Sequence, residues 1–173
     1  MPGVHKGLVL AVHPTGRCFG WVLFEAPLAP VDWGIVFAQK GRNVRLMNRF
    51  DRLVIRYEPA VLVLEEFSGK ASRRTSSTER LCRTMMHGAA CRGMEMQVLR
   101  RAVIRTVFAS AGARTRYEIA EVVRQQIDAF SHRMPRKRTL LAREDPKQAL
   151  FDAAALALTH FALQGEGPRP PAP

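Results

Sequence analysis

Residues 60–66 read AVLVLEE, a run of apolar and β-branched residues that ends in two glutamates. The run is continuous and lacks the alternation of a half-exposed strand, which is typical of a strand buried on both faces of a sheet. Pro59 precedes it and ends the segment before it, because proline cannot continue a helix. This stretch therefore predicts a central strand and, with it, a domain of the α/β class.

Three short apolar runs and one helical pattern precede the central strand. The runs span Leu8 to Val12, Phe19 to Phe24 and Trp33 to Ala38, and they predict a strand meander at the start of a mixed sheet. Between them and Pro59, apolar residues recur at helical spacing while arginines occupy other positions. The apolar residues are Leu46, Phe50, Leu53, Val54 and Tyr57, and the arginines are Arg42, Arg45, Arg49, Arg52 and Arg56.

Helices dominate the chain after residue 66. A loop rich in Gly, Ser, Thr and Arg is predicted over 68–77, a helix over 78–91 and a strand over 96–99. Helices are also predicted over 100–109, from about 119 to 130 and over 145–163. Asp145-Pro146 gives the last helix an N-cap followed by proline at its first position. The order β-β-β-α-β-α-β-α-α-α predicts a mixed α/β domain.

Length and composition exclude several other classes of protein. The chain of 173 residues has the size of one globular domain. No apolar run approaches the roughly 18 to 20 residues of a membrane span, and the first run is too short for a signal sequence. Its three cysteines indicate neither a disulfide framework nor a zinc knuckle. We expect a cytoplasmic protein without membrane contact and a disordered Pro/Gly-rich tail over 164–173.

The net charge of +12 is concentrated in one part of the sequence. Residues 70–143 contain 17 basic and 5 acidic residues, against 8 and 6 in residues 1–69 and 2 and 4 in residues 144–173. Nearly all the basic residues of the middle segment are arginine, which binds phosphate oxygens through two parallel hydrogen bonds. A solvated basic surface would also explain the count. A polyanionic partner, with nucleic acid the commonest, explains it better.

Residues that could carry chemistry lie in three predicted elements. Glu65 and Glu66 follow the central strand, where functional sites of α/β sheets gather, and they point to opposite faces. His13 ends the first strand, and Asp152 lies in the apolar stretch FDAAALALTH. The ordinary explanation of His13 is a structural role, and that of Asp152 is a position on the exposed face of an amphipathic helix. Together, His13, Glu65 and Asp152 could instead hold divalent cations for phosphodiester hydrolysis.

Over residues 7–163 the chain resembles the RuvC family of Holliday junction resolvases, within the ribonuclease H-like superfamily. The resemblance lies in LVLAVHPTGRCFGWVLFE (8–25), EPAVLVLEEFSGKASRRTSS (58–77), RRAVIRTVFASAGART (100–115) and FDAAALALTHF (151–161). It implies a ribonuclease H-like fold over residues 1–163, with a five-stranded mixed sheet and helices on both faces. It also implies a homodimer that acts on branched DNA, with helix 78–91 at the interface.

Two positions depart from the family's acidic pattern. His13 stands where the family has a metal-bridging Asp, and Ala149 stands where an acidic ligand is usual, so Glu65 and Asp152 remain. An imidazole presents one lone pair and no charge, and it cannot bridge two Mg²⁺ ions as a carboxylate does. His13, Glu65 and Asp152 are thus the expected catalytic and metal-binding residues. Together they favour either a single ion, Mg²⁺ or Mn²⁺, or no metal.

The resemblance also assigns residues to DNA. The loop and helix that contain Arg73, Arg74, Arg80 and Arg83 would line the junction-binding cleft, and Arg114 would lie near the scissile phosphate. A surface loop with a helix cap at Ser77 or Thr78 is the alternative. Three functions follow: a metal-dependent structure-selective endonuclease, a relative that binds junctions or other nucleic acid without cutting, and a basic structural or adaptor protein with a partner other than DNA.

Overall fold

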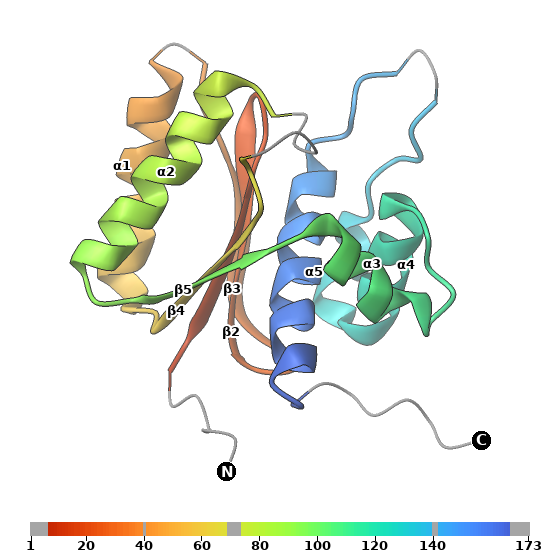
Figure 1. The fold of residues 1–173 in the computed structure, drawn as a ribbon. Helices are drawn as coiled ribbons and strands as arrows, with labels where there is room; N and C mark the ends of the chain where they lie inside the picture. Colours follow the sequence, from red (N-terminus) through yellow and green to blue (C-terminus); the bar gives the residue numbers. More distant parts are fainter. Residues whose placement is uncertain (1–6, 40, 69–73, 140–141, 167–173) are drawn as a thin grey trace.

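The chain folds around one five-stranded mixed sheet, as predicted (Figure 1). A computed structural model describes residues 7–39, 41–68, 74–139 and 142–166. The strands lie in the order β3-β2-β1-β4-β5. Strand β2 pairs antiparallel with β1 and β3, whereas β4 pairs parallel with β1 and β5. Their bounds are β1 Val9–Pro14, β2 Cys18–Ala26, β3 Ala29–Phe37, β4 Val61–Glu65 and β5 Glu95–Leu99.

Helices cover both faces of the sheet, which confirms the predicted layers. In Figure 1, α1 and α2 lie on one face, and α3, α4 and α5 lie on the other. The predicted helix that reached residue 130 is shorter, because α4 ends at Gln126 and a 3-10 turn, η1, follows. The bounds are α1 Arg42–Tyr57, α2 Ser76–Cys91, α3 Arg101–Ala109, α4 Arg116–Gln126, η1 Asp128–Arg133 and α5 Lys147–Leu163.

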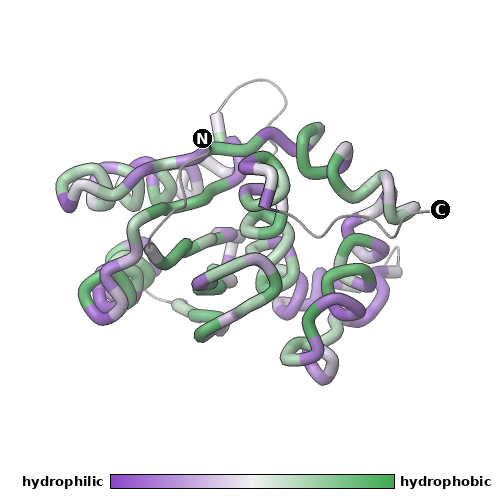
Figure 2. Tube along the Cα trace, turned by 90° about the horizontal axis from the view of Figure 1, so that it is seen from below, coloured by the Kyte–Doolittle hydropathy of each residue, from purple (hydrophilic) through white to green (hydrophobic). Residues whose placement is uncertain are grey.

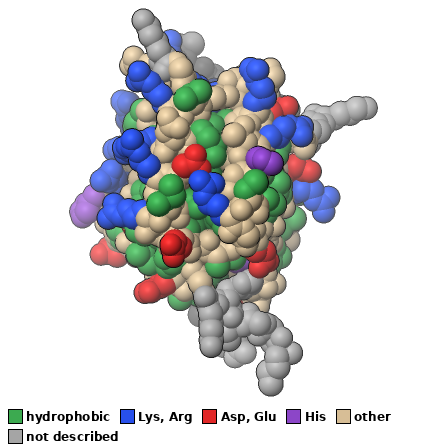
Figure 3. All heavy atoms as spheres, turned by 90° about the vertical axis from the view of Figure 1, so that its left-hand side faces the viewer, with side chains coloured by type: hydrophobic (Ala, Val, Ile, Leu, Met, Phe, Trp, Pro, Cys, Tyr) green, Lys and Arg blue, Asp and Glu red, His purple; other side chains and the backbone are tan. Residues whose placement is uncertain are grey.

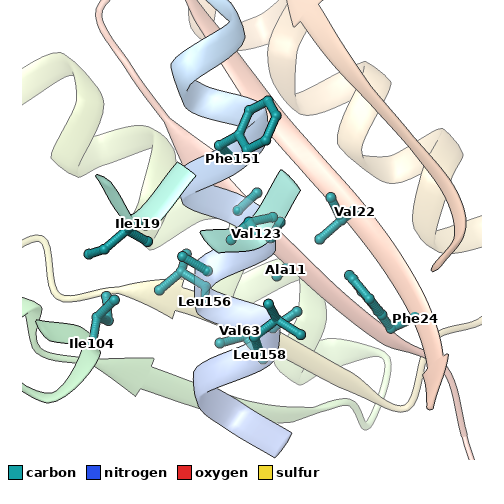
Figure 4. Close-up of a cluster of buried hydrophobic side chains, with 14 of the residues drawn as sticks. Ala11, Val22, Phe24, Val63, Ile104, Ile119, Val123, Phe151, Leu156 and Leu158 are labelled. Carbon is teal, nitrogen blue, oxygen red and sulfur yellow. The ribbon is translucent and has the colours of Figure 1, made fainter. Parts of the chain in front are cut away.

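The central strand β4 is buried on both faces, as its continuous apolar run predicts. Val61 and Val63 pack on the α5 side, where Figure 4 shows Val63 beside α5. Leu62 and Leu64 pack on the side of α1 and α2. Figure 2 shows hydrophilic and hydrophobic residues alternating along these two flanking helices. The sheet therefore separates two hydrophobic cores, and its strand ends are fixed from both sides.

Helix α5 is buried on all sides rather than amphipathic, so the exposed-face explanation of Asp152 is wrong. The helix begins at Lys147, two residues after the predicted start, and the Asp145 carboxylate accepts the backbone N–H of Lys147 at 3.0 Å. None of the helices in the described ranges is long and apolar enough to cross a membrane. Of the predicted tail, residues 164–166 are described, and 167–173 lie outside the described residues.

Candidate functional site

Three buried polar side chains meet at the carboxyl ends of β1 and β4, beside α5. The Nδ1 atom of His13 lies 3.4 Å from Glu65 Oε2, and its Nε2 atom lies 3.5 Å from Asp152 Oδ2. The three residues are 5%, 8% and 6% exposed. The structure thus brings together the three residues proposed from the sequence, one from each of the three elements.

Pairing and close packing produce this convergence. The parallel register sets Val12 of β1 beside Leu64 of β4, so the next residues of both strands, His13 and Glu65, emerge together at the sheet edge. Gly20 of β2 pairs with His13. A Cβ atom at Gly20 would lie 2.1 Å from the carbonyl oxygen of Ala149, so the missing side chain lets α5 approach the sheet. Asp152, nearly one helical turn beyond Ala149, then reaches His13.

Two arginines hold the Glu65 carboxylate. Arg101, the first residue of α3, binds it through both oxygens, with Nε 2.7 Å from Oε1 and one terminal nitrogen 2.9 Å from Oε2. A terminal nitrogen of Arg74 lies 3.4 Å from Oε2 and 3.5 Å from His13 Nδ1. Arg74 also donates to the carbonyl oxygen of Pro14. The bidentate bond with Arg101 fixes the Glu65 carboxylate in one orientation.

A third arginine holds Asp152. Arg116, the first residue of α4, donates to both carboxylate oxygens of Asp152, and it lies 2.6 Å from Glu144 Oε1. Gln148, one turn earlier on α5, donates to Asp152 Oδ1 at 3.1 Å. Burial opposes ionisation of Asp152, but the charge and hydrogen bonds of the Arg116 guanidinium, with the charge of Arg101, outweigh it and hold the pKa of this carboxyl below its ordinary value. Asp152 is therefore an ionised, arginine-bound carboxylate.

His13 is neutral in this environment. Burial lowers its pKa well below the ordinary 6.5, and the positive charges of Arg74, Arg116 and Arg101 lower it further against the opposing effect of Asp152. A neutral imidazole has one N–H donor and one acceptor nitrogen. The contacts fit a tautomer in which Nε2–H faces Asp152 and Nδ1 faces the guanidinium of Arg74. His13 thus contributes no charge where a carboxylate would contribute one.

We refer to His13, Glu65 and Asp152 with Arg74, Arg101 and Arg116 as the arginine–carboxylate cluster. This donor set does not fit a pair of divalent cations, because three guanidinium groups already neutralise its two carboxylates. A cation there would be repelled by each guanidinium, by about 4 kcal/mol per unit charge at 4 Å and an effective dielectric constant of about 20. Within the described ranges, no group of three or more His, Cys, Asp or Glu side chains could hold a metal ion.

The residues predicted to bind DNA divide into three groups. Arg74 belongs to the arginine–carboxylate cluster, while Arg80 and Arg83 are exposed on α2. Arg114 is also exposed, and its backbone N–H, rather than its side chain, binds Glu118. Arg73 lies outside the described residues. Arg114 is therefore not among the side chains that the fold brings to the cluster.

Two cluster residues received no individual role from the sequence. Arg101 comes one residue after Arg100, which follows β5, and β5 runs parallel to β4 with Leu99 beside Glu65, so the sheet-edge argument extended to β5 would have pointed to this segment. Arg116 begins α4 behind the cap residue Thr115, whose side chain and that of Glu118 form a reciprocal capping box. That pattern predicts the start of the helix but not its contact with Asp152, which depends on packing between α4 and α5.

Comparison with known proteins finds matches at the level of structure. No protein-family model and no curated protein sequence matches the chain. Thermus thermophilus RuvC in complex with a Holliday junction substrate superposes with a TM-score of 0.66 at 18% identity, over 92% of this chain and 97% of that one. The yeast mitochondrial Holliday junction resolvase gives 0.59 at 12% identity, over 91% and 80% of the two chains.

A third solved structure supports the same class of fold. Fowlpox virus resolvase in a complex with Holliday junction DNA gives a TM-score of 0.55 at 12% identity, over 90% of this chain and 99% of that one. The chain therefore has the ribonuclease H-like fold of the Holliday junction resolvases. The resemblance proposed from the sequence is confirmed at the level of the fold.

Proposed function

We propose that this protein binds branched DNA, with the four-way junction as its substrate class, and does not cut it with paired divalent cations. The observation that carries the proposal is the arginine–carboxylate cluster, in which Glu65 and Asp152 are bound by arginines and His13 is neutral. DNA binding does not need metal ligands, because phosphate contacts supply most of the affinity. The net charge of +12 and the resolvase fold support this role.

A nuclease that uses one ion is the second candidate. The observation in its favour is that two carboxylates each lie within 3.5 Å of a ring nitrogen of one imidazole, Glu65 at Nδ1 and Asp152 at Nε2 of His13. If DNA phosphates drew Arg74, Arg101 and Arg116 away and the three side chains rearranged, an imidazole nitrogen and carboxylate oxygens could hold a single Mg²⁺ or Mn²⁺ ion. The bound ion would supply Lewis-acid stabilisation of the phosphate, while the same arginines would orient the DNA backbone.

The two candidates are separated by measuring binding and cutting in parallel. We expect tighter binding to a four-way junction than to duplex DNA of equal length, with the same affinity in EDTA and in Mg²⁺. We expect weak or absent cutting of a labelled junction by the wild type in Mg²⁺. Equal affinity for junction and duplex would contradict the proposed substrate class. Robust wild-type cutting in Mg²⁺ would contradict the proposed lack of catalysis, and cutting in Mn²⁺ alone would favour the one-ion candidate.

Two variants make the cutting assay sharper. His13→Asp supplies a carboxylate at the end of β1, and we expect it to create or raise Mg²⁺-dependent cutting. Adding Glu65→Gln to His13→Asp should abolish that cutting. Junction binding in EDTA should change little in either variant, since the arginines are unchanged. No cutting by any variant would leave the binding function as proposed and show that other positions, such as Ala149, also matter.

We also propose that the protein binds junctions as a homodimer. A four-way junction has two-fold symmetry, and two copies related by a two-fold axis match it. Two large apolar side chains at the edge strand β5, Met96 and Val98, are exposed, and β5 packs beside α2, the helix expected at the interface. Light scattering of the free protein and of its junction complex tests the stoichiometry. One copy per junction would contradict this part of the proposal.

A further inference from the structure

Helix α1 carries a row of arginines that the candidate site does not use. Arg45, Arg49, Arg52 and Arg56 follow one another at steps of four, three and four residues, so they lie on one side of the helix. All four are exposed, whereas Leu46, Phe50 and Val54 of the same helix are buried. Figure 3 shows a column of Lys and Arg side chains down one margin of the face formed by α1 and α2. We call these four residues the α1 arginine row.

The charge of the α1 arginine row is not neutralised within the part of the chain that the structure describes. None of its members forms an ion pair there, and the one carboxylate within α1, Asp51, binds Arg92 of α2 at 3.1 Å. The guanidinium of Arg56 lies 4.9 Å from the ring centre of its neighbour Tyr57. By contrast, Arg74, Arg101 and Arg116 are bound to carboxylates. The row is therefore an uncompensated concentration of positive charge.

An open groove of about 380 Å³ runs beside the row. The groove is lined by Arg45, Arg49 and Arg52 on one side and by residues of the edge strand β3, including Phe37, on the other. Phe37 is 61% exposed, although it is a large aromatic side chain. Guanidinium groups suit phosphate oxygens, and an exposed aromatic ring offers an apolar surface to the sugars of a backbone. The combination matches the chemistry of a nucleic-acid backbone better than that of an acidic peptide, which has no sugars for the ring.

The row begins near the candidate site and leads away from it. Arg42, at the start of α1, donates to the carbonyl oxygen of Thr15 in the β1–β2 turn and to Thr78 Oγ1 of α2 at 3.1 Å. The first turn of α1 is thus tied to the end of the sheet that carries His13. From Arg45 to Arg56 the helix rises about 16 Å, or almost five base-pair steps of a duplex. A duplex arm that leaves the site along α1 would meet all four arginines.

We propose that the α1 arginine row is a second DNA-binding surface, which holds the phosphate backbone of a duplex arm outside the candidate site. The inference rests on the proposed function, because it presupposes a branched DNA bound at the cluster. The proposed function predicts only that affinity for DNA depends on the branch point. The second surface predicts that affinity for a junction also depends on the length of its arms. The linear count of charge, which put the excess in residues 70–143, gives no sign of this surface.

The test compares junctions whose arms are about 8 and about 20 base pairs long, roughly 27 and 68 Å at 3.4 Å per step. The variant Arg49→Gln/Arg52→Gln/Arg56→Gln removes three charges from the row. We expect the wild type to bind the long-armed junction more tightly, and the variant to lose most of that gain, on the order of tenfold in affinity. Its slope of log K against log salt on the long-armed junction should fall by up to about 0.9 per lost contact.

A matched control distinguishes loss of the α1 arginine row from a general loss of positive charge. The variant Arg105→Gln/Arg124→Gln/Arg133→Gln removes as many charges from α3, α4 and η1, on the other side of the sheet, and should keep the arm-length gain. Equal losses in both variants, or no loss in the α1 variant, would overturn the inference while leaving junction binding intact. Failure of the wild type to prefer a junction would instead overturn the proposed function. Circular dichroism of both variants checks that they are folded.

Discussion

The ion pair between Arg116 and Asp152 can be measured by a double-mutant cycle. Arg116→Gln removes both bonds to a carboxylate whose side chain is 5% exposed, while the Arg116 side chain itself is 34% exposed. Breaking a fully buried pair costs about 3–5 kcal/mol, and an exposed pair contributes about 0.2–1 kcal/mol. With one partner buried and the other partly solvated, we expect a coupling free energy of about 2 kcal/mol. A loss of stability of that size would lower Tm by about 4–8 °C, at 2–4 °C per kcal/mol for this chain length.

The assay is urea unfolding of the wild type, Arg116→Gln, Asp152→Asn and the double variant. The double variant should be more stable than the sum of the two single effects predicts, by the coupling free energy. The surface pair Arg92–Asp51, with side chains 37% and 32% exposed, is the control and should couple by less than about 1 kcal/mol. A coupling of Arg116 with Asp152 below about 0.5 kcal/mol would refute the view that this arginine holds Asp152 ionised.

The contribution of the Asp152 carboxylate to stability should depend on pH in one direction. The pKa of Asp152 is lower in the folded protein than its ordinary value of 3.8. An acid with a depressed folded pKa stabilises the fold above its unfolded pKa, and that contribution is lost as the pH falls through the folded pKa. The difference in stability between the wild type and Asp152→Asn should therefore shrink below pH 3.8. A difference that grew on acidification would contradict the assignment.

Three further predictions concern other parts of the fold. Gly20→Ala should cost about 3 kcal/mol in urea unfolding, because its methyl group would overlap the backbone of α5, and a neutral effect would contradict the close approach. Cys91 is exposed and should react with a thiol reagent in the folded protein, while burial raises the pKa of Cys18 and Cys82 and protects them; three equally fast thiols would contradict this. The pKa of His13 is lower in the folded protein than in the unfolded chain, so the wild type should lose stability as the pH falls below 6.5. The variant His13→Gln should lose less stability over the same range. Parallel pH profiles of the two proteins would show that His13 is not buried as a neutral ring.

The order of elements and the centre of the site could be predicted from the sequence because both depend on local pattern. The continuous run AVLVLEE indicates a strand buried on two faces, and Val61–Glu65 is such a strand. The rule that functional groups gather at the carboxyl ends of strands was enough to choose His13 and Glu65. Asp152 was noticeable for a similar reason, since a carboxylate in an apolar helix needs a partner.

The arginines could not be assigned in the same way, because their positions follow from tertiary packing. Arg101 lies 36 residues from Glu65 and Arg116 lies 36 residues from Asp152, and no periodicity joins members of these pairs. A count of charge along the chain also misleads. It combines the α1 arginine row with acidic residues such as Glu65, which the fold places elsewhere, and so gives residues 1–69 a charge of only +2.

The burial of α5 has a consequence for the order in which the chain folds during synthesis. Helix α5 packs against β1, β2, β3 and β4 as well as α3 and α4, and of the described helices and strands it leaves the ribosome last. Until then, this face of the sheet lacks the helix that packs most directly on its strands, and the core around Val63 and Phe24 is incomplete. We therefore expect nascent chains shorter than residue 163 to remain sensitive to protease and to bind chaperones, and the sheet to become protected only after α5 has emerged.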